Sequence, residues 1–325
     1  MTQIVIHLKE SDLGRALDGW HLSLYRVIDD LARRQGITLT LRQRDRDIRV
    51  GTRTIADDRF ADGNLHIIDD RSVSAPGVLN AGVAYFWEYW HLDPMGVKAF
   101  SSIGDQAFDP DAIDPDQARD FVETLRDRYA RKRRSKYDQP GDRRSFPAGA
   151  LAVFMQGSYP QSSGAARMDD FEMLSIVMDQ AGDRRVIVKP HPLASDAYDL
   201  ALLRDMARRD RRILIAEANV YDILQASAVT ISQNSTVALE GFMCGIPAIL
   251  FARSDFHHQA GTITAPEDFG PTLQAQLAGD HDFSRYLYWY FTKHCLDLHS
   301  PDLHSQIWAR FEAAGFGRSA FDPAG

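Results

Sequence analysis

Three short polar segments in the second half of the sequence combine residue types that bind phosphate. They are the small-residue loop Gln156-Gly157-Ser158, the run KPHP at residues 189–192 and the run SQNST at residues 232–236. Backbone amides in a glycine loop, an ammonium beside an imidazole, and hydroxyls at a helix start can all hold an oxyanion. Each segment alone is also compatible with an ordinary turn or helix cap. Together they predict a phosphate-binding site.

His191 is the candidate for chemistry in this set. Prolines on both sides restrict its backbone and hold the imidazole in one direction, with Pro192 fixing the turn that follows. A histidine titrates near neutrality, so it can hydrogen-bond to or protonate a departing phosphate oxygen. Lys189, two residues earlier, adds a positive charge.

The third segment places Asn234, Ser235 and Thr236 directly before the run VALEGFMCG. Hydroxyls at a helix start cap the helix, and the same position attracts anions. Glu240 follows one helical turn after Thr236 and can either accept ribose hydroxyls or only cap the surface. The KPHP strand end and this helix start, in one sheet, predict the two sides of a nucleotide phosphate pocket. Neither GxGxxG nor GxxxxGK[ST] occurs in the sequence, which argues against an NAD-binding domain and a P-loop ATPase.

Apolar strands alternate with helices on both sides of a change in composition near residue 146. In the second half the strands LAVFM, RVIVK, RILI, AVTI and PAILF predict a doubly wound parallel sheet. In the first half QIVIHL, residues 37–41 and residues 65–68 predict a Rossmann-like β, α, β pattern. Ligands bind beyond the carboxyl ends of such strands, where the three polar segments lie.

The expected fold class is α/β with two Rossmann-like domains facing a cleft. We place one domain at residues 1–146, a second domain at residues 147–282, and closing helices across both at residues 283–325. A prolyl and basic stretch between residues 109 and 146 sets the first boundary, and no strand pattern returns after Gly270.

Composition excludes several classes of protein. The 325 residues are 44% hydrophobic with a formal charge of −8, which is typical of a globular protein and argues against a surface built for nucleic acid. Two cysteines exclude a disulfide framework and a Cys-rich zinc site, and they fit a reducing compartment. No run approaches the roughly 20 apolar residues of a membrane span. We expect a cytoplasmic protein.

The combination of HP with a hydroxyl pair resembles the donor site of GT-B glycosyltransferases that use CMP-activated sugars. Residues 85–101, YFWEYWHLDPMGVKAFS, resemble a segment of capsule polysaccharide biosynthesis proteins, as do GIPAIL at residues 245–250 and RYLYW at residues 285–289. The resemblance covers about residues 80–295. Two departures stand out: the family's RPDW is WEYW here, and its usual Glu after Leu is Asp93.

The resemblance implies a GT-B transferase that moves Kdo (3-deoxy-manno-octulosonate) or a related ulosonic acid from a CMP-sugar to a capsule or lipid-linked glycan. Residues 1–146 would then be the acceptor domain and residues 147–282 the nucleotide-sugar-binding domain. His191, with Lys189, Ser235 and Thr236, would stabilise the phosphate of departing CMP, and Asp93 would act as base. No metal or other cofactor is required on this interpretation. Some family members carry an acidic residue where this chain has residues 158–161, SYPQ, so a covalent sugar intermediate on that loop is not expected.

Two alternatives remain open from the sequence. The first is a transferase or epimerase that uses CDP-glycerol or a UDP-sugar, since these enzymes also place a histidine and a hydroxyl-bearing helix start at phosphate. The second is a non-catalytic glycan-binding or export-associated relative with the same fold.

Two further clusters are candidates for ligand contact. His258 follows the strand PAILF on the ligand side of the sheet, so we assign it to the carboxylate of donor or acceptor. The basic run Arg131, Lys132, Arg133 and Arg134 can contact an anionic lipid surface, which would make the protein peripheral at the inner face of the membrane. A solvated linker is the alternative for this run.

Overall fold

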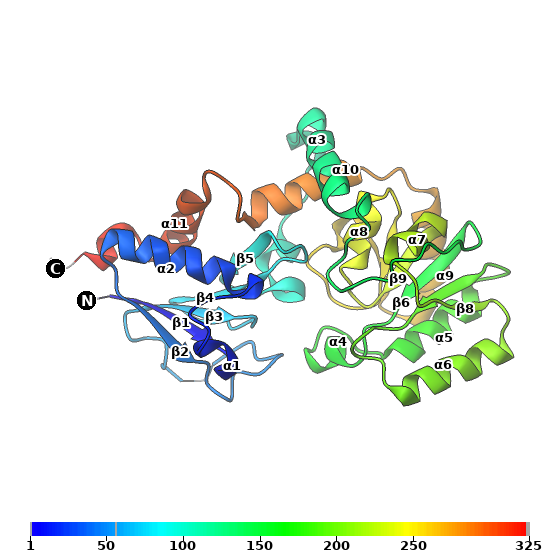
Figure 1. The fold of residues 1–325 in the computed structure, drawn as a ribbon, viewed down its shortest axis with the longest axis horizontal. Coiled ribbons are helices and arrows are strands. Elements are labelled where there is room, and N and C mark those ends of the chain that lie inside the picture. Colours follow the sequence, from blue (N-terminus) through cyan, green and yellow to red (C-terminus); the bar gives the residue numbers. More distant parts are fainter. Residues whose placement is uncertain (1, 56, 323–325) are drawn as a thin grey trace. The chain divides into compact units, whose positions relative to one another are not determined.

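The computed structural model describes residues 2–55 and 57–322, which divide into two compact units. Unit 1 contains residues up to 106 together with the segment from 290 onward, and unit 2 contains residues 107–289. Each unit is built on one six-stranded sheet (Figure 1). The fold class predicted from the sequence, α/β with two Rossmann-like units, is confirmed.

Unit 1 has the strand order β12-β5-β4-β3-β1-β2. The strands from β1 to β4 are parallel, whereas the two pairs at one edge, β4–β5 and β5–β12, are antiparallel. The strands are β1 (Ile4–Leu8), β2 (Leu39–Gln43), β3 (Leu65–Asp69), β4 (Val78–Val83), β5 (Tyr89–Asp93) and β12 (Leu296–Asp297). The pair β12–β5 contradicts the expectation that no strand follows Gly270.

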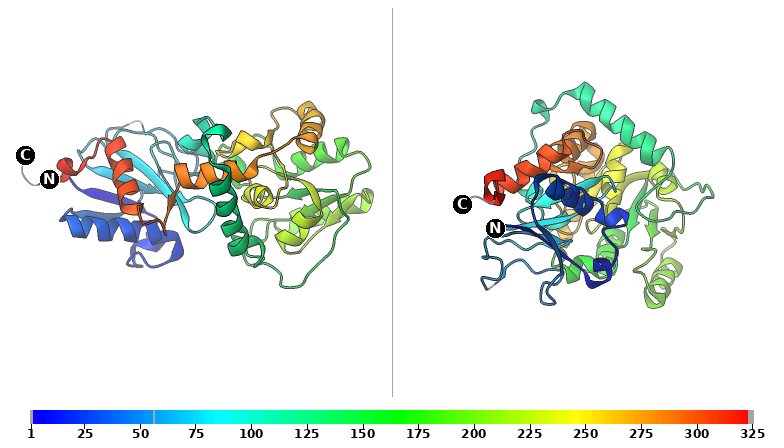
Figure 2. Two further views of the ribbon diagram at one scale, coloured as in Figure 1. Left: turned by 90° about the horizontal axis from the view of Figure 1, so that it is seen from above. Right: turned by 60° about the vertical axis from the view of Figure 1, so that its left-hand side comes forward.

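Alternating side chains of the unit 1 sheet build two cores. Ile4, Ile6 and Leu8 belong to the larger core, to which α2 (Ser23–Gln35) and α11 (Leu303–Ala313) contribute; both helices lie beside this sheet (Figures 1 and 2). A smaller core contains Ile68 and the loop residues Ile48 and Phe60. A short helix, α1 (Glu10–Leu13), follows β1 directly.

Unit 2 has the all-parallel strand order β11-β10-β9-β6-β7-β8. The strands are β6 (Ala150–Phe154), β7 (Val186–Lys189), β8 (Ile213–Ile215), β9 (Ser227–Ser232), β10 (Ala248–Leu250) and β11 (Gly261–Thr262). In chain order this is 3-2-1-4-5-6, in which the direction of winding reverses between β6 and β9. The sequence predicted all five longer strands of this sheet, because buried parallel strands are continuous apolar runs.

Helices connect the parallel strands of unit 2. They are α4 (Tyr159–Ser162), α5 (Asp170–Gln180), α6 (Ala197–Arg209), α7 (Val220–Ala226), α8 (Val237–Met243) and α9 (Phe269–Ala278). The core beneath α5 contains Leu151, Val153, Met173 and Val177. Asp169 caps α5 with a capping box, accepting from the backbone amides of Phe171 and Glu172.

The boundary between the units differs from the expected one at residue 146. Helix α3 (Pro115–Leu125) packs against α10 (Phe283–Tyr288) within unit 2, where the Tyr288 hydroxyl donates to Gln117 Oε1 at 2.9 Å. The chain returns to unit 1 at Tyr290. The residues expected to form one set of closing helices, 283–325, are therefore divided between the two units.

No helix among the described residues combines the length and the apolar character that a membrane crossing requires.

Candidate active site at the carboxyl edge of the unit 2 sheet

The three polar segments predicted from the sequence meet at the carboxyl edge of the unit 2 sheet. Gln156 follows β6 and Asn234 follows β9, and their side chains form a hydrogen bond from Gln156 Nε2 to Asn234 Oδ1 at 3.0 Å. The Asn234 amide donates to Gln156 Oε1 at 2.8 Å. This contact lies where the direction of winding reverses, the position at which open α/β sheets bind ligands.

Gly157 brings the loop after β7 against the loop after β6. Its φ is +67°, in the left-handed region, and a Cβ at this position would lie 2.8 Å from the Cβ of Ala194. Only glycine combines that backbone conformation with so close an approach. Ala194 belongs to the turn that follows His191, so the loop of Gln156 and the KPHP turn are in contact.

The turn after β7 fixes the tautomer of His191. The backbone amides of Leu193 and Ala194 donate to His191 Nδ1 at 3.2 and 3.0 Å. An Nδ1 that accepts cannot carry a proton, so the neutral ring has its proton on Nε2. Burial, with the charges of Lys136 and Lys189, lowers the pKa of His191 below the ordinary value. His191 is thus a neutral hydrogen-bond donor through Nε2.

Lys189 and Glu240 are two charged residues of this region whose pKa values are shifted by burial. Lys189 Nζ donates to the Ala218 carbonyl at 2.7 Å, and burial lowers the pKa of this lysine. Glu240 is fully buried, and burial raises its pKa to about 7, against the opposing effects of Ser135, Tyr221 and Lys189. The Tyr221 hydroxyl donates to Glu240 Oε1 at 3.4 Å. The ribose contact expected for Glu240 is not available to a side chain so enclosed.

The predicted hydroxyl residues lie at the start of α8. Ser235 Oγ accepts from the Val237 amide at 3.3 Å, and the Ser235 amide donates to Ser232 Oγ at 3.1 Å. Ser235 and Thr236 are half-buried, whereas Ser158 and Pro192 are exposed. The hydroxyl of Ser235 therefore accepts from the first residue of α8, whereas Thr236, the N-cap residue, makes no side-chain capping bond.

Asp170 is a member of the site that the sequence analysis did not select. Its Oδ2 accepts from the amides of Gln156 and Gly157 at 2.6 and 2.7 Å, which holds the loop after β6 in place. Burial raises the pKa of Asp170 to about 6. The sequence feature that could have indicated this role is the acidic pair at residues 169–170, which follows a glycine loop. Asp169 caps the helix, so the side chain of Asp170 is able to bind the backbone of the loop.

The segment after α3 also belongs to this region. The ring of Tyr137 packs edge-on against His191 at 5.1 Å between centroids, and Gln139 Oε1 accepts from the Val220 amide at 3.0 Å. Arg133 Nη2 donates to Asp222 Oδ2 at 2.7 Å. This segment packs on unit 2, which excludes the alternative of a fully solvated linker for it.

The four residues of the basic run have different surroundings. Arg133 is paired with Asp222, and Arg131 forms ion pairs with Glu123 and Asp127. Lys132 and Arg134 are exposed. Arg131 and Arg133, two of the four residues that we assigned to lipid contact, are therefore engaged within unit 2.

His258 lies in an aromatic cluster. Its Nδ1 is 3.2 Å from the Tyr286 hydroxyl, and its ring packs edge-on against Trp289 and face-to-face against His257. These contacts are with α10 and its continuation rather than with the three loops. Among residues 2–55 and 57–322, no three His, Cys, Asp or Glu side chains gather closely enough to hold a metal ion.

Asp93, predicted as a base, holds a turn in unit 1. Oδ1 accepts from the amides of Met95 and Gly96 at 2.8 and 3.0 Å. Oδ2 accepts from the amide and the hydroxyl of Ser102 at 2.9 and 2.6 Å. Four donors occupy a carboxylate that is almost completely buried, so neither oxygen is placed to take a proton from an acceptor. The structure thus corrects the role that we assigned to Asp93.

Comparison with known proteins supports the fold. No protein-family model matches the chain, and no curated protein matches it in sequence. The solved structure of Thermosulfurimonas dismutans KpsC, beta Kdo 2,7 transferase, aligns over 97% of this chain and 99% of that chain, with a TM-score of 0.54 at 12% identity.

Two further solved structures are similar to a smaller degree. The beta Kdo 2,4 transferase of the same KpsC aligns over 88% of this chain and 97% of that chain, with a TM-score of 0.48 at 13% identity. The Methanocaldococcus jannaschii UDP-GlcNAc 2-epimerase aligns over 65% of this chain and 50% of that chain, with a TM-score of 0.33 at 10% identity. The two parallel-rich sheets, together with the alignment to the beta Kdo 2,7 transferase, give the chain a GT-B glycosyltransferase fold.

Proposed function

We propose that this protein is a glycosyltransferase that moves a sugar, Kdo or a related ulosonic acid, from a CMP-activated donor to a glycan or glycolipid acceptor. The observation that carries the proposal is the meeting of three polar loops at the winding reversal of the unit 2 sheet, marked by the pair Gln156–Asn234. The GT-B fold and the alignment with a beta Kdo transferase over nearly the whole of both chains support a transferase of this kind. The choice of CMP rests on the resemblance of the HP and hydroxyl-pair residues. At that level of identity, the fold alone is shared.

In this proposal the donor phosphate lies over the loops after β7 and β9. His191 donates from Nε2 to the phosphate of departing CMP, and Lys189 contributes its positive charge from below. Ser235, Thr236 and the backbone of the loop at Gln156 and Gly157 line the same place. Catalysis consists of positioning and of stabilising the charge that develops on the leaving group. A neutral histidine donor suits this task, because it needs no proton from solvent.

The acceptor belongs to unit 1 in this proposal, but its proton is not taken by Asp93. The four donors on that carboxylate hold the turn from Met95 to Ser102. Peripheral contact with the inner face of the membrane would involve Lys132 and Arg134, the exposed members of the basic run. Co-sedimentation with phosphatidylglycerol vesicles that is lost in Lys132→Gln/Arg134→Gln supports this contact, and unchanged or absent co-sedimentation contradicts it.

A thermal-shift titration with CMP, CDP, UMP, UDP and ADP tests the donor. A ligand that binds only the folded state raises the melting temperature by mass action. We expect a selective shift with CMP that is lost in His191→Ala and in Ser235→Ala. His304→Ala and Ser305→Ala, at exposed positions of α11 in unit 1, are matched controls that keep the shift. Transfer from CMP-Kdo, assayed directly, then tests the reaction.

The other outcomes separate the alternatives. A shift with UDP or CDP and none with CMP replaces the donor by a UDP-sugar or CDP-glycerol. No shift with any nucleotide contradicts the donor site and favours a glycan-binding protein without transferase activity.

A further inference from the structure

Unit 1 contains a second polar pocket that the proposed donor site does not use. The pocket has a volume of about 250 Å³ and is lined by residues that follow β1, β2 and β3. The order β2-β1-β3-β4 reverses its winding between β1 and β3, so this is the ligand-binding edge of the unit 1 sheet. Its lining contains five cationic side chains and two acidic ones: Lys9, Arg44, Arg46, Arg49 and Arg71, with Glu10 and Asp45.

Two of the arginines are fixed by backbone carbonyls. Arg44 Nη1 donates to the Asp69 carbonyl at 2.7 Å, and Arg71 donates to the carbonyls of Ile48 and Asp70 at 3.2 and 2.7 Å. A carbonyl orients a guanidinium without neutralising its charge. Arg44 also lies 3.6 Å from a carboxyl oxygen of Asp69, whose pKa is raised to about 6 mainly by burial. Both guanidinium groups are therefore held in place at this edge of the sheet.

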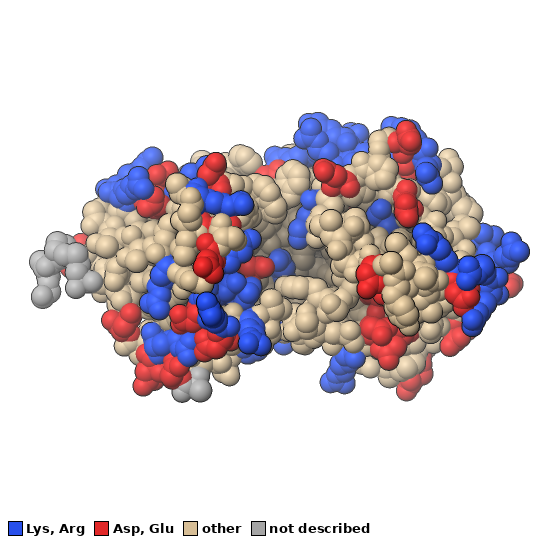
Figure 3. Space-filling view, turned by 60° about the horizontal axis from the view of Figure 1, so that its bottom comes forward, with Lys and Arg blue, Asp and Glu red and all other residues tan. Residues whose placement is uncertain are grey.

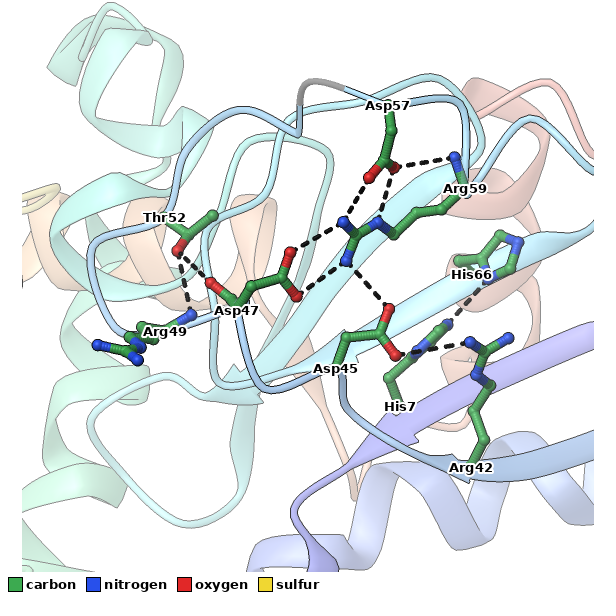
Figure 4. A network of polar contacts seen from close by, with 9 residues as sticks. All are labelled: His7, Arg42, Asp45, Asp47, Arg49, Thr52, Asp57, Arg59 and His66. Carbon is green, nitrogen blue, oxygen red and sulfur yellow. Dashed lines mark hydrogen bonds and ion pairs between the residues drawn. The ribbon is translucent and has the colours of Figure 1, made fainter.

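Arg59 contacts Asp45, one of the two acidic residues that line the pocket. Its guanidinium contacts Asp45 at 3.2 Å and Asp47 at 2.9 Å, and it also pairs with Asp57 (Figure 4). Asp45 faces a second cation, Arg42, at 3.6 Å. Two arginines that do not line the pocket, Arg59 and Arg42, therefore contact Asp45, and Arg59 is shared with Asp47 and Asp57.

The same loop presents two more arginines to solvent. Ile48 is 2% exposed in the smaller core of unit 1, which anchors the loop between Arg46 and Arg49. Both arginines are exposed, and within the described part of the chain no acceptor lies within hydrogen-bond distance of either guanidinium. Figure 3 shows Lys and Arg side chains interspersed with acidic ones on the face of unit 1 that it presents. Arg46 and Arg49 are placed to meet a ligand.

We propose that this pocket binds an oxyanion, a carboxylate or a phosphate, carried by the acceptor sugar. Arginine forks match the two oxygens of either group, which favours an anion over a neutral sugar. The volume is smaller than that of sites for whole drug-sized ligands, so the pocket takes the anionic end of a longer molecule. That the anion is part of the acceptor rests on the proposed function; that the pocket binds an anion does not.

Calorimetric titration of the full chain with glucuronate, glucose 1-phosphate and glucose tests the inference. We expect one or both anionic sugars to bind at millimolar concentration or below, with affinity that falls as salt is added, and glucose not to bind. Arg46→Gln/Arg49→Gln should weaken binding roughly tenfold or more, because charge-assisted hydrogen bonds are lost. Whichever anionic sugar binds with higher affinity shows whether the pocket prefers a carboxylate or a phosphate.

Two variants control for net charge and for loop position. Arg33→Gln/Arg34→Gln removes the same charge from the last turn of α2, at the opposite end of the sheet, and should bind as the wild type does. Arg59→Lys keeps the charge but loses the planar fork that gathers three carboxylates, and should weaken binding without removing a lining residue. Equal binding by wild type and Arg46→Gln/Arg49→Gln, or no binding of either anion to wild type, overturns the inference.

CMP binding, measured on the same proteins, separates this inference from the proposed function. Anion binding at Arg46 and Arg49 without any nucleotide shift leaves the pocket in place and refutes the transferase. A thermal shift with CMP but no anion binding supports the proposed donor site and overturns the anion-binding pocket.

Discussion

The side chain of Gln156 joins the loops after β6 and β9 through two hydrogen bonds with Asn234, one from Gln156 Nε2 to Asn234 Oδ1 and one from the backbone N–H of Asn234 to Gln156 Oε1. A glutamine amide has both a donor and an acceptor, so one residue satisfies both partners. Asn234 Nδ2 continues the chain of bonds to the Arg253 carbonyl at 2.8 Å, after β10. The loops of three strands are thereby held together at one edge of the sheet.

Replacing Gln156 should therefore affect ligand binding more than folding. In Gln156→Ala we expect a loss of about 1–3 kcal/mol in the free energy of unfolding and a loss of the CMP-induced thermal shift. Gln180→Ala is a matched control: Gln180 donates to the Pro266 carbonyl at 2.8 Å and accepts from the Gly270 amide at 2.9 Å, beside α9. It should lose similar stability and keep the CMP shift. An unchanged shift in Gln156→Ala would show that the loops bind independently.

The loops of the candidate site could be predicted because they follow apolar strands directly. Val186, Ile187 and Val188 are buried on both faces of the sheet, which makes β7 recognisable and places Lys189 and His191 at its end. The pairing of Gln156 with Asn234 could not be predicted, because it depends on which strands are neighbours and joins residues 78 positions apart. Glu240 was assigned to ribose because helical spacing shows which side of the helix a residue lies on, but not how deeply it is buried.

Other elements were missed because tertiary contacts override local pattern. β4 contains Asn80, a polar residue in mid-strand, whose amide is buried and bonds with the backbone of Val73. The boundary at residue 146 was placed by composition, but composition does not show on which unit a basic segment packs. Arg126 Nε donates to the Met243 carbonyl at 2.6 Å and Arg133 pairs with Asp222, which secure the segment to unit 2.

Glu240 predicts a fall in stability as pH rises. Its pKa is about 7 in the folded state against an ordinary 4.5, so between these values the folded state keeps a proton that the unfolded state has lost. Stability should fall through that range and level off above it. Glu240→Gln removes this dependence, and the difference between variant and wild type should grow by up to about 3 kcal/mol from pH 4 to pH 8 in urea unfolding.

Comparison with the glutamine variant isolates Glu240 from other buried acids. The pKa values of Asp69 and Asp170 are also raised, to about 6, but both residues are present in the two proteins and cancel in the difference. Parallel stability curves for wild type and Glu240→Gln would contradict the raised pKa.

Asp93→Asn should reduce stability without acting through proton transfer. In an asparagine, the NH2 group cannot accept the hydrogen bonds of the two donors that it would face. We therefore expect the free energy of unfolding to fall by about 1–3 kcal/mol, measured by chemical unfolding, and the CMP-induced thermal shift to be unchanged. Asp268→Asn is the matched control, since Asp268 Oδ2 accepts from the amides of Thr264 and Ala265 and the Thr264 hydroxyl but is half-exposed. Its loss should be smaller. Full stability with abolished transfer would restore Asp93 as base.

His191 should titrate below the ordinary histidine range, with its proton on Nε2 when neutral. Burial and the charges of Lys136 and Lys189 lower its pKa, and protonation of Nδ1 would break the two bonds from the amides of Leu193 and Ala194. Nitrogen-15 NMR distinguishes the two tautomers and gives the midpoint of titration.

The chemical consequence of that tautomer concerns the pH dependence of transfer. Neutral His191 is already a donor through Nε2, so its function does not require the decline at high pH that is expected of a general acid. Transfer from CMP-Kdo should therefore not decline as His191 loses its charge. A rate that falls with the measured midpoint of His191 as pH rises would show that the imidazolium is the active form. An Nδ1–H tautomer would contradict the bonds to Leu193 and Ala194, and with them the direction in which His191 donates.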